Sequence, residues 1–368
     1  MKSAVGFVTV LCAAGFLAAA GLNPAASSGL TIHEWGTFTS VAGEDGSAVA
    51  WDVLGCKSDL PRFVNSFGGF KGALVETVRM ETPVMYFYSS RDLDAQVTVK
   101  FPKGLITEWF PQADNQTGAR TIAWKNIKVQ PNSSPAFPIE SEPSRYYAAR
   151  DTDAAPIAVG DQHEKFLFYR GVGSFPVPLS VRVVSDGTIA VENRGLQAIP
   201  AVFLFENRGG RLGYRNAGAV STAAVLDSPA LDSSLSVLRN DLETALIAEG
   251  LFPSEAQAMV ETWRDSWFEE GSRLIYILPT PAVDPILPLQ VEPAPSQTVR
   301  VFVGRIEIVT PETKRSVESA IAKSDWLAIG RYNSRFLDPI LTRIYPGNRD
   351  RVNGIEQLVR NAQGGYCG

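Results

Sequence analysis

Residues 30–40 read Leu30-Thr-Ile-His-Glu-Trp-Gly-Thr-Phe-Thr-Ser40, a run of β-branched, aromatic and small residues. Such residues favour an extended strand, in which neighbouring side chains point to opposite faces. One face then carries His33, Trp35 and Thr37, and the other carries Ile32, Glu34, Gly36 and Phe38. Because Ile32 and Phe38 have the character of core residues, we expect Glu34 to point inward with them.

Similar runs predict many short strands in the following part of the chain. They cover residues 78–89, 95–102, 105–111, 121–129, 165–172, 179–185, 188–192 and 201–206. Asp186-Gly187 lies between two β-branched runs, which is typical of a two-residue hairpin turn. Many short strands with close turns favour an antiparallel sandwich or barrel.

Helical spacing begins near residue 224, where leucines recur at positions 235, 238, 242 and 246. A second helix is expected from Ser254, with an apolar face that ends in Trp263 and Trp267. We therefore expect an α+β fold with an antiparallel β-sandwich-like lobe at residues 29–222. A helix-rich C-terminal lobe follows at residues 223–368, and its two strands, 273–278 and 299–309, pack on the sheet.

The first 28 residues predict a secretory signal peptide. A basic start at Lys2 precedes an apolar stretch and a small-residue exit, as such peptides require. An uncleaved anchor is the alternative, because 19 apolar residues could just span a bilayer. With cleavage, no membrane span is expected, and the protein is periplasmic or extracellular. Cys56 and Cys367 then remain, either as one disulfide in an oxidising compartment or as two separate thiols.

Composition excludes several classes of protein. The net charge of −5 over 368 residues lacks the basic footprint of a nucleic-acid-binding protein. The chain has no phosphate-binding P-loop, no dinucleotide fingerprint and no Gly-x-Ser-x-Gly nucleophile motif. With two histidines and three cysteines, a zinc site of the usual composition is not expected either. We expect no cofactor and no metal.

The alternation of side chains along the strands predicts that four charged residues point inward, where they could form a site. Glu34 points inward, Arg79 and Glu81 share a face with Met85 and Phe87, and Arg170 follows Phe168 on its face. We therefore predict an inward cluster of Glu34, Arg79, Glu81 and Arg170. Arginine holds carboxylate, phosphate or sulfate groups, and two carboxylates could act on a glycosidic bond. The alternative is an ion-pair network that serves folding alone.

A second candidate site closes the proline-rich stretch at residues 130–158. Tyr146, Tyr147, Arg150 and Asp153 combine aromatic rings with charges, a set suited to sugar or peptide recognition. The alternative is a solvated loop that returns to the sheet.

The segment His33-Glu-Trp-Gly-Thr-Phe-Thr-Ser-Val41 resembles the opening of a group of exported bacterial proteins. Similar proteins also carry counterparts of residues 79–84, 164–173, 262–271 and 301–305. The resemblance covers most of the mature chain and implies an exported protein whose two lobes form one unit. It implies no activity and no catalytic residue.

Two classes of function follow from these patterns. The first is non-catalytic binding of a glycan, a peptide or an envelope component, which the missing catalytic motifs favour. The second is a hydrolase, directed at a polysaccharide, that uses Glu34 and Glu81 with the arginines.

Overall fold

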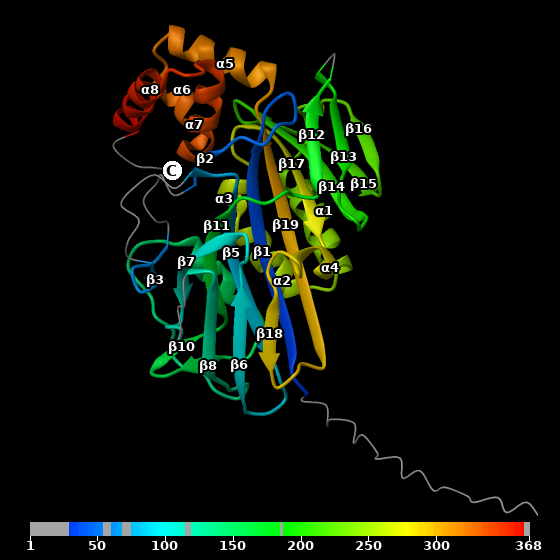
Figure 1. Cartoon of the computed structure of the whole chain (residues 1–368), viewed down its shortest axis with the longest axis vertical. Coiled ribbons are helices and arrows are strands. Elements are labelled where there is room, and N and C mark those ends of the chain that lie inside the picture. The colour runs from blue at the N-terminus through cyan, green and yellow to red at the C-terminus, as the bar shows by residue number, and fades with distance from the viewer. Residues whose placement is uncertain (1–28, 54–59, 68–74, 115–118, 185–186, 364–368) are drawn as a thin grey trace, which may run out of the picture.

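The strand at the start of the chain forms the centre of a large sheet in a computed structural model, which describes residues 29–53, 60–67, 75–114, 119–184 and 187–363. β1 (Thr31–Ala42) pairs in parallel with β19 (Gln297–Ile308) and antiparallel with β5 (Val78–Tyr88). Segments from both ends of the chain therefore meet in the middle of this sheet (Figure 1). From edge to edge the nine strands are β15 (Arg211–Val220), β14 (Ile199–Arg208), β17 (Gly271–Leu278), β19, β1, β5, β11 (Leu167–Gly173), β7 (Gly104–Phe110) and β3 (Asn65–Ser66).

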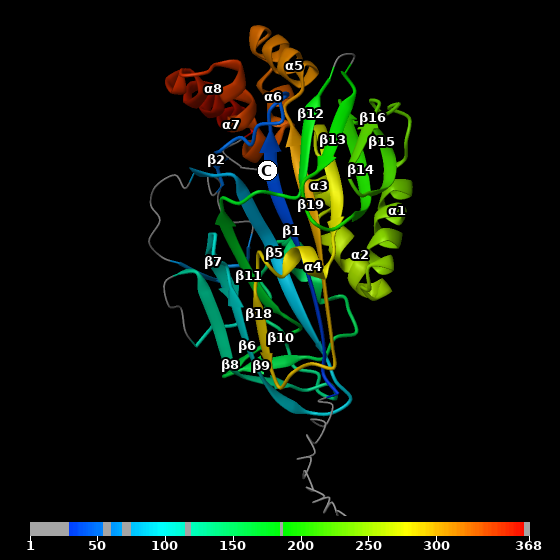
Figure 2. The same ribbon diagram turned by 45° about the vertical axis from the view of Figure 1, so that its right-hand side comes forward.

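Two smaller antiparallel sheets pack on one face of the nine-stranded sheet. The five-stranded sheet contains β10 (Gln162–Glu164), β9 (Ile157–Val159), β8 (Thr121–Val129), β6 (Leu93–Lys100) and β18 (Leu289–Glu292). The three-stranded sheet contains β12 (Leu179–Val183), β13 (Ile189–Asn193) and β16 (Ala223–Leu226). Figure 2 shows these two sheets toward opposite ends of the molecule, with the short helix α4 (Thr280–Val283) between them. The second layer of the sandwich is therefore split.

Helices cover the other face and one end of the large sheet. A core of aromatic and aliphatic side chains joins the sheet to η2 (Arg145–Arg150), α1 (Leu235–Ala248), α2 (Pro253–Thr262) and α3 (Arg264–Trp267). A separate core at the end of β1 and β19 contains α5 (Pro311–Ala322), α6 (Trp326–Gly330), α7 (Asn333–Ile344) and α8 (Arg349–Ala362). A short pair, β2 (Trp51–Asp52) and β4 (Val75–Glu76), lies beside these helices.

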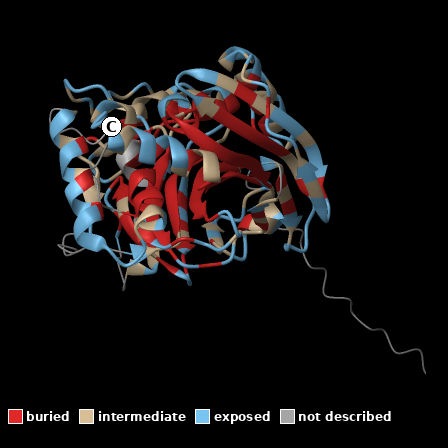
Figure 3. Ribbon diagram, turned by 90° about the horizontal axis from the view of Figure 1, so that it is seen from above, coloured by how far each residue is buried: buried red, intermediate tan, exposed pale blue. Residues whose placement is uncertain are grey.

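The large sheet is consequently buried on both faces. Figure 3 shows its strands in red, enclosed by exposed segments in pale blue. Eleven of the twelve residues of β1 are buried, including polar ones such as His33, Thr37 and Thr39. Both faces of β1 are therefore buried. A buried side chain of β1 can point either toward the two smaller sheets or toward the helices on the other face.

The expected α+β class is confirmed, with antiparallel sheets in a sandwich and a helical C-terminal region. The arrangement of the two lobes differs from the expectation. β17 and β19 do not pack on a finished sheet, because they are hydrogen-bonded between β14 and β1 in its middle. The residues before and after position 222 thus share one sheet.

Candidate functional site

Glu34 points into the sandwich side of the sheet, where it is fully buried. Its carboxylate accepts hydrogen bonds from Arg300 Nε at 2.6 Å and from the Tyr169 hydroxyl at 2.5 Å. Burial and then the charge of Glu34 raise the pKa of Tyr169 well above its usual value. Burial alone would lower the pKa of Arg300, but Glu34 and Tyr169 outweigh burial and raise it. Both carboxylate oxygens are therefore occupied by donors.

Arg79 and Glu81 lie on the opposite face from Glu34, so the four residues do not form the single cluster expected. β5 contains a bulge, at which Thr82 adopts a left-handed conformation with φ of 49° and the register with β1 shifts. The extra residue turns Arg79 and Glu81 away from the face of Met85.

Arg170 follows Phe168 on the helix-covered face, as the alternation predicted, and Glu34 alone faces the sandwich. Glu81 accepts a hydrogen bond from Thr39 at 2.9 Å, and one of its oxygens lies 3.3 Å from Arg79 Nε. The arrangement on this face resembles the ion-pair network that was the alternative to a site.

Further charges extend this network across the helix-covered face. Arg273 donates to Glu307 at 2.8 Å, and both side chains are buried. Arg305 donates to Ser266 at 3.0 Å and to Glu269 at 3.2 Å. Burial, with Arg273 nearby, lowers the pKa of Arg305 to about 10. Burial raises the pKa of Glu307, although the charge of Arg273 opposes this shift.

The side chains of the candidate loop at residues 146–153 are occupied by contacts within the protein. Arg150 forms two hydrogen bonds to the buried carboxylate of Glu164, at 2.9 and 2.6 Å, and Tyr146 donates to the same carboxylate at 3.1 Å. The guanidinium also lies over the Tyr147 ring, at 4.9 Å from its centre. Burial raises the pKa of Glu164 even though Arg150 opposes the shift.

These contacts use the groups of that loop that would recognise a ligand. Tyr146 is buried, and the Tyr147 hydroxyl accepts a hydrogen bond from the backbone of Glu140 at 3.0 Å. Asp153 is exposed and accepts from Ser254 at 3.2 Å. The loop is therefore neither the solvated turn nor the open recognition surface that the sequence suggested.

A buried histidine was not among the candidate site residues. His33 Nδ1 lies 2.8 Å from Glu255 Oε2, and the other oxygen of Glu255 accepts from the Tyr88 hydroxyl at 2.9 Å. The first oxygen also accepts from the backbone amide of Phe252, whose ring stacks on His33. The pair fastens α2 to β1, and no local sequence pattern joins residues 222 positions apart.

Some expectations fall on residues outside the described part of the chain. These are the signal peptide, Cys56, Cys367 and Asp186 of the hairpin turn. Within the described ranges, no three histidine, cysteine or acidic side chains come together in a way that could hold a metal ion. In the same ranges, no helix has the length and apolar character that a membrane crossing needs.

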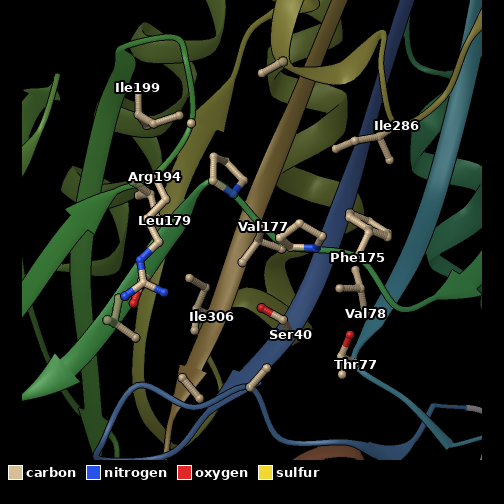
Figure 4. Close-up of a pocket in the computed structure, with 18 of the residues that line it drawn as sticks. Ser40, Thr77, Val78, Phe175, Val177, Leu179, Arg194, Ile199, Ile286 and Ile306 are labelled. Carbon is tan, nitrogen blue, oxygen red and sulfur yellow. The ribbon is translucent and has the colours of Figure 1, made fainter. Parts of the chain in front are cut away.

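A pocket of about 540 Å³ lies where the second layer of the sandwich is split. Its floor is the large sheet, with Ser40 on β1, Val78 on β5 and Ile306 on β19 (Figure 4). Its walls are β12, the segment 175–178 that leads into β12, the loop 194–197 and residues 281–286 around α4. We call this cavity the inter-sheet pocket.

The lining of the inter-sheet pocket is mostly apolar and includes Phe175, Val177, Leu179 and Ile286 (Figure 4). Exposed residues such as Leu196 lie at its rim. Its volume falls in the range of pockets that bind small molecules, about 300–1,000 Å³. The sequence reasoning missed these residues, because they come from seven separate segments that only the tertiary structure brings together.

No family model matches the chain, and no curated protein is similar to it in sequence. Among solved structures, it is similar to the mu homology domain of Fcho1 from Danio rerio, determined with a bound Eps15 peptide. That match has a TM-score of 0.34 and 7% identity, and it covers 76% of this chain and 96% of the other. A second match is the yeast delta-COP-I mu-homology domain, with a TM-score of 0.29, 10% identity and the same coverage.

Proposed function

We propose that this chain is a non-catalytic binding protein that holds a ligand with an apolar body in the inter-sheet pocket. The observation that carries the proposal is the split second layer, which leaves an open pocket with a mostly apolar lining, including the partly exposed Val177, Ala282 and Ile286. Burying the apolar surface of a ligand there is favourable, at about 25 cal/mol per Å². Consistent with the sequence, we propose that this binding takes place in the periplasm or outside the cell.

The lining of the pocket favours an envelope component with an apolar body over a glycan. Glycans stack on exposed aromatic faces and need many polar partners, but the aromatic residue of this lining, Phe175, is only 8% exposed. An envelope component with an apolar body leaves no polar groups unpaired in such a lining.

The hydrolase hypothesis finds less support in the geometry. Glu34 and Glu81 lie on opposite faces of the sheet, and each carboxylate is buried against an arginine and a hydroxyl group. Two carboxylates that act on one glycosidic bond must flank it from the same cavity.

Pocket-filling variants test the proposed function. Ala282 on α4 and Ser180 on β12 both line the pocket, so Ala282→Trp and Ser180→Trp each introduce an indole at the cavity. We expect both variants to weaken binding of the uncharged fluorescent probe N-phenyl-1-naphthylamine by at least about tenfold, since the ring and the probe compete for one volume.

Ala223→Trp serves as the matched control, because Ala223 is exposed on the far edge of the three-stranded sheet. Circular dichroism would confirm that all three variants are folded. If Ala282→Trp and Ser180→Trp bind the probe as tightly as the control does, the proposed function is wrong.

A further inference from the structure

We propose that the ligand of the inter-sheet pocket is an aliphatic carboxylate whose head group is held by Arg194 while its alkyl chain lies on the apolar lining. This inference rests on the proposed function and adds the class of ligand and its orientation.

The charges around the pocket favour an anion. Arg194 and Lys103 are the charged residues of the lining, and no aspartate or glutamate is among the described residues that form it. The lining itself is therefore positive in a chain whose net charge is −5, and the nearest carboxylate, Glu192, is the present partner of Arg194. A ligand that brings a negative charge to the rim is therefore complementary to the site.

Arg194 is held in place by its backbone. Its amide donates to the carbonyl of Pro178 at 2.8 Å, which ties the loop to the entrance of β12. Asn193 fixes the same loop, since its side chain accepts from the amide of Gly195 at 2.9 Å and donates to the carbonyl of Gln197 at 2.8 Å. Figure 4 shows the Arg194 side chain extending along the wall of the pocket beside Leu179. The loop thus fixes the backbone of Arg194 at the rim, within reach of the pocket.

The present partner of this guanidinium can be exchanged. Arg194 Nε and Nη2 donate to one oxygen of Glu192, at 3.1 and 3.0 Å, and the two side chains are 63% and 61% exposed. Exposed pairs of this kind contribute little to stability, so replacing Glu192 by a ligand carboxylate costs little. A guanidinium binds a carboxylate with two parallel hydrogen bonds, which selects a planar anionic head group.

The apolar lining of the pocket is suited to an alkyl chain. Val78 and Ile306 close the floor and are almost fully buried, and the more accessible aliphatic side chains, Val177 and Ile286, belong to the walls (Figure 4). A saturated chain has no polar atoms that would need partners on this surface, whereas sugar hydroxyl groups would be left unpaired. Head group and chain therefore have distinct places in the same cavity.

A competition experiment on the full chain tests the assignment. Dodecanoate and dodecanol would displace N-phenyl-1-naphthylamine from the wild type and from Arg194→Gln, Arg182→Gln and Glu192→Gln. We expect Arg194→Gln to weaken dodecanoate binding by about twofold to fivefold, the size of an ion pair at an exposed guanidinium, and to leave dodecanol binding unchanged. Arg182 is exposed on the same strand β12 but does not line the pocket, so its variant should behave as wild type.

Glu192→Gln removes the competing carboxylate, and we expect it to raise the affinity for dodecanoate by about twofold or more. If dodecanoate and dodecanol bind equally and Arg194→Gln changes neither, the head-group assignment is wrong while the pocket remains a binding site. If neither compound displaces the probe, an aliphatic ligand is excluded. If Ala282→Trp also binds the probe as tightly as the wild type does, the proposed function is wrong as well.

Discussion

Arg273 is fully buried on the helix-covered face, where its guanidinium bonds to Glu307 and to the backbone carbonyls of Trp267, Glu269 and Glu270. Removing one partner of a buried ion pair leaves an uncompensated charge, which typically costs about 3–5 kcal/mol. We expect Arg273→Met to lower the free energy of unfolding by that amount at neutral pH, measured by urea denaturation. Arg91→Met, at an exposed arginine, should change it by less than about 0.5 kcal/mol.

The loss in Arg273→Met should depend on pH. Burial already raises the pKa of Glu307 above 4.5, and without Arg273 this pKa rises further. An acid whose pKa is higher in the folded state stabilises that state while protonated, and this contribution is lost as pH rises from the unfolded pKa through the folded one. We therefore expect a smaller deficit at pH 5 than at pH 8. The double variant Arg273→Met, Glu307→Leu should lose this pH dependence, and an equal deficit at both pH values in the single variant would contradict the argument.

The burial of Glu34 could be predicted from the sequence, because Ile32 and Phe38 share its face of the strand. Its partner could not, since Arg300 lies 266 positions away and reaches Glu34 only through the parallel pairing of β1 with β19. His33 and Glu255 show the same limit. Local patterns indicate which polar residues are buried, whereas the pairing of distant segments decides which groups form hydrogen bonds or ion pairs with them.

Alternation along β5 predicted the strand but not its faces. The expected strand at residues 78–89 corresponds to β5 (Val78–Tyr88), and the Thr82 bulge reverses the faces of Arg79 and Glu81 relative to Met85. A bulge depends on the register of the neighbouring strand, which one strand's sequence does not contain. Because both faces of the sheet are buried, apolar neighbours could not reveal the error.

A close approach between β17 and β19 gives a test of strand packing. A Cβ atom at Gly304 would lie 2.0 Å from the nearest ring atom of Tyr276, which is its cross-strand partner and is fully buried. We expect Gly304→Ala to lower the free energy of unfolding by about 1–3 kcal/mol, because the ring has no room to move. Chemical denaturation would measure the change.

Gly354→Ala is the matched control for this substitution. Gly354 lies inside α8, and a Cβ atom there meets nothing within 4 Å. The same chemical change should therefore stabilise the protein by up to about 1 kcal/mol through helix propensity. Equal effects at the two glycines would show that the contact with Tyr276 does not matter.

The inter-sheet pocket arises from how the sheets are divided. One layer of the sandwich is a continuous sheet, whereas the other consists of two sheets joined by no hydrogen-bonded strand pair among the described residues. The sequence predicted a sandwich from short strands and close turns, but strand order is set by pairings between distant segments. The class of fold was therefore predictable, and the gap in its second layer was not.

This division also predicts where the structure opens and where a ligand protects it. β1 and β19 are buried on both faces in the middle of the large sheet, so their amides should exchange with deuterium most slowly. The three-stranded sheet and the loop 194–197 have solvent on one side and should exchange faster.

Dodecanoate at about 100 times its Kd should slow exchange in β12 and in the loop 194–197, by up to about a hundredfold where opening requires its release. Exchange in β8 and β9, which do not line the pocket, should not change under the same conditions. Arg194→Gln at the same dodecanoate concentration should show a weaker protection of β12. Protection confined to α5–α8, or spread evenly over all sheets, would place the ligand elsewhere, because β12 and that loop both line the inter-sheet pocket.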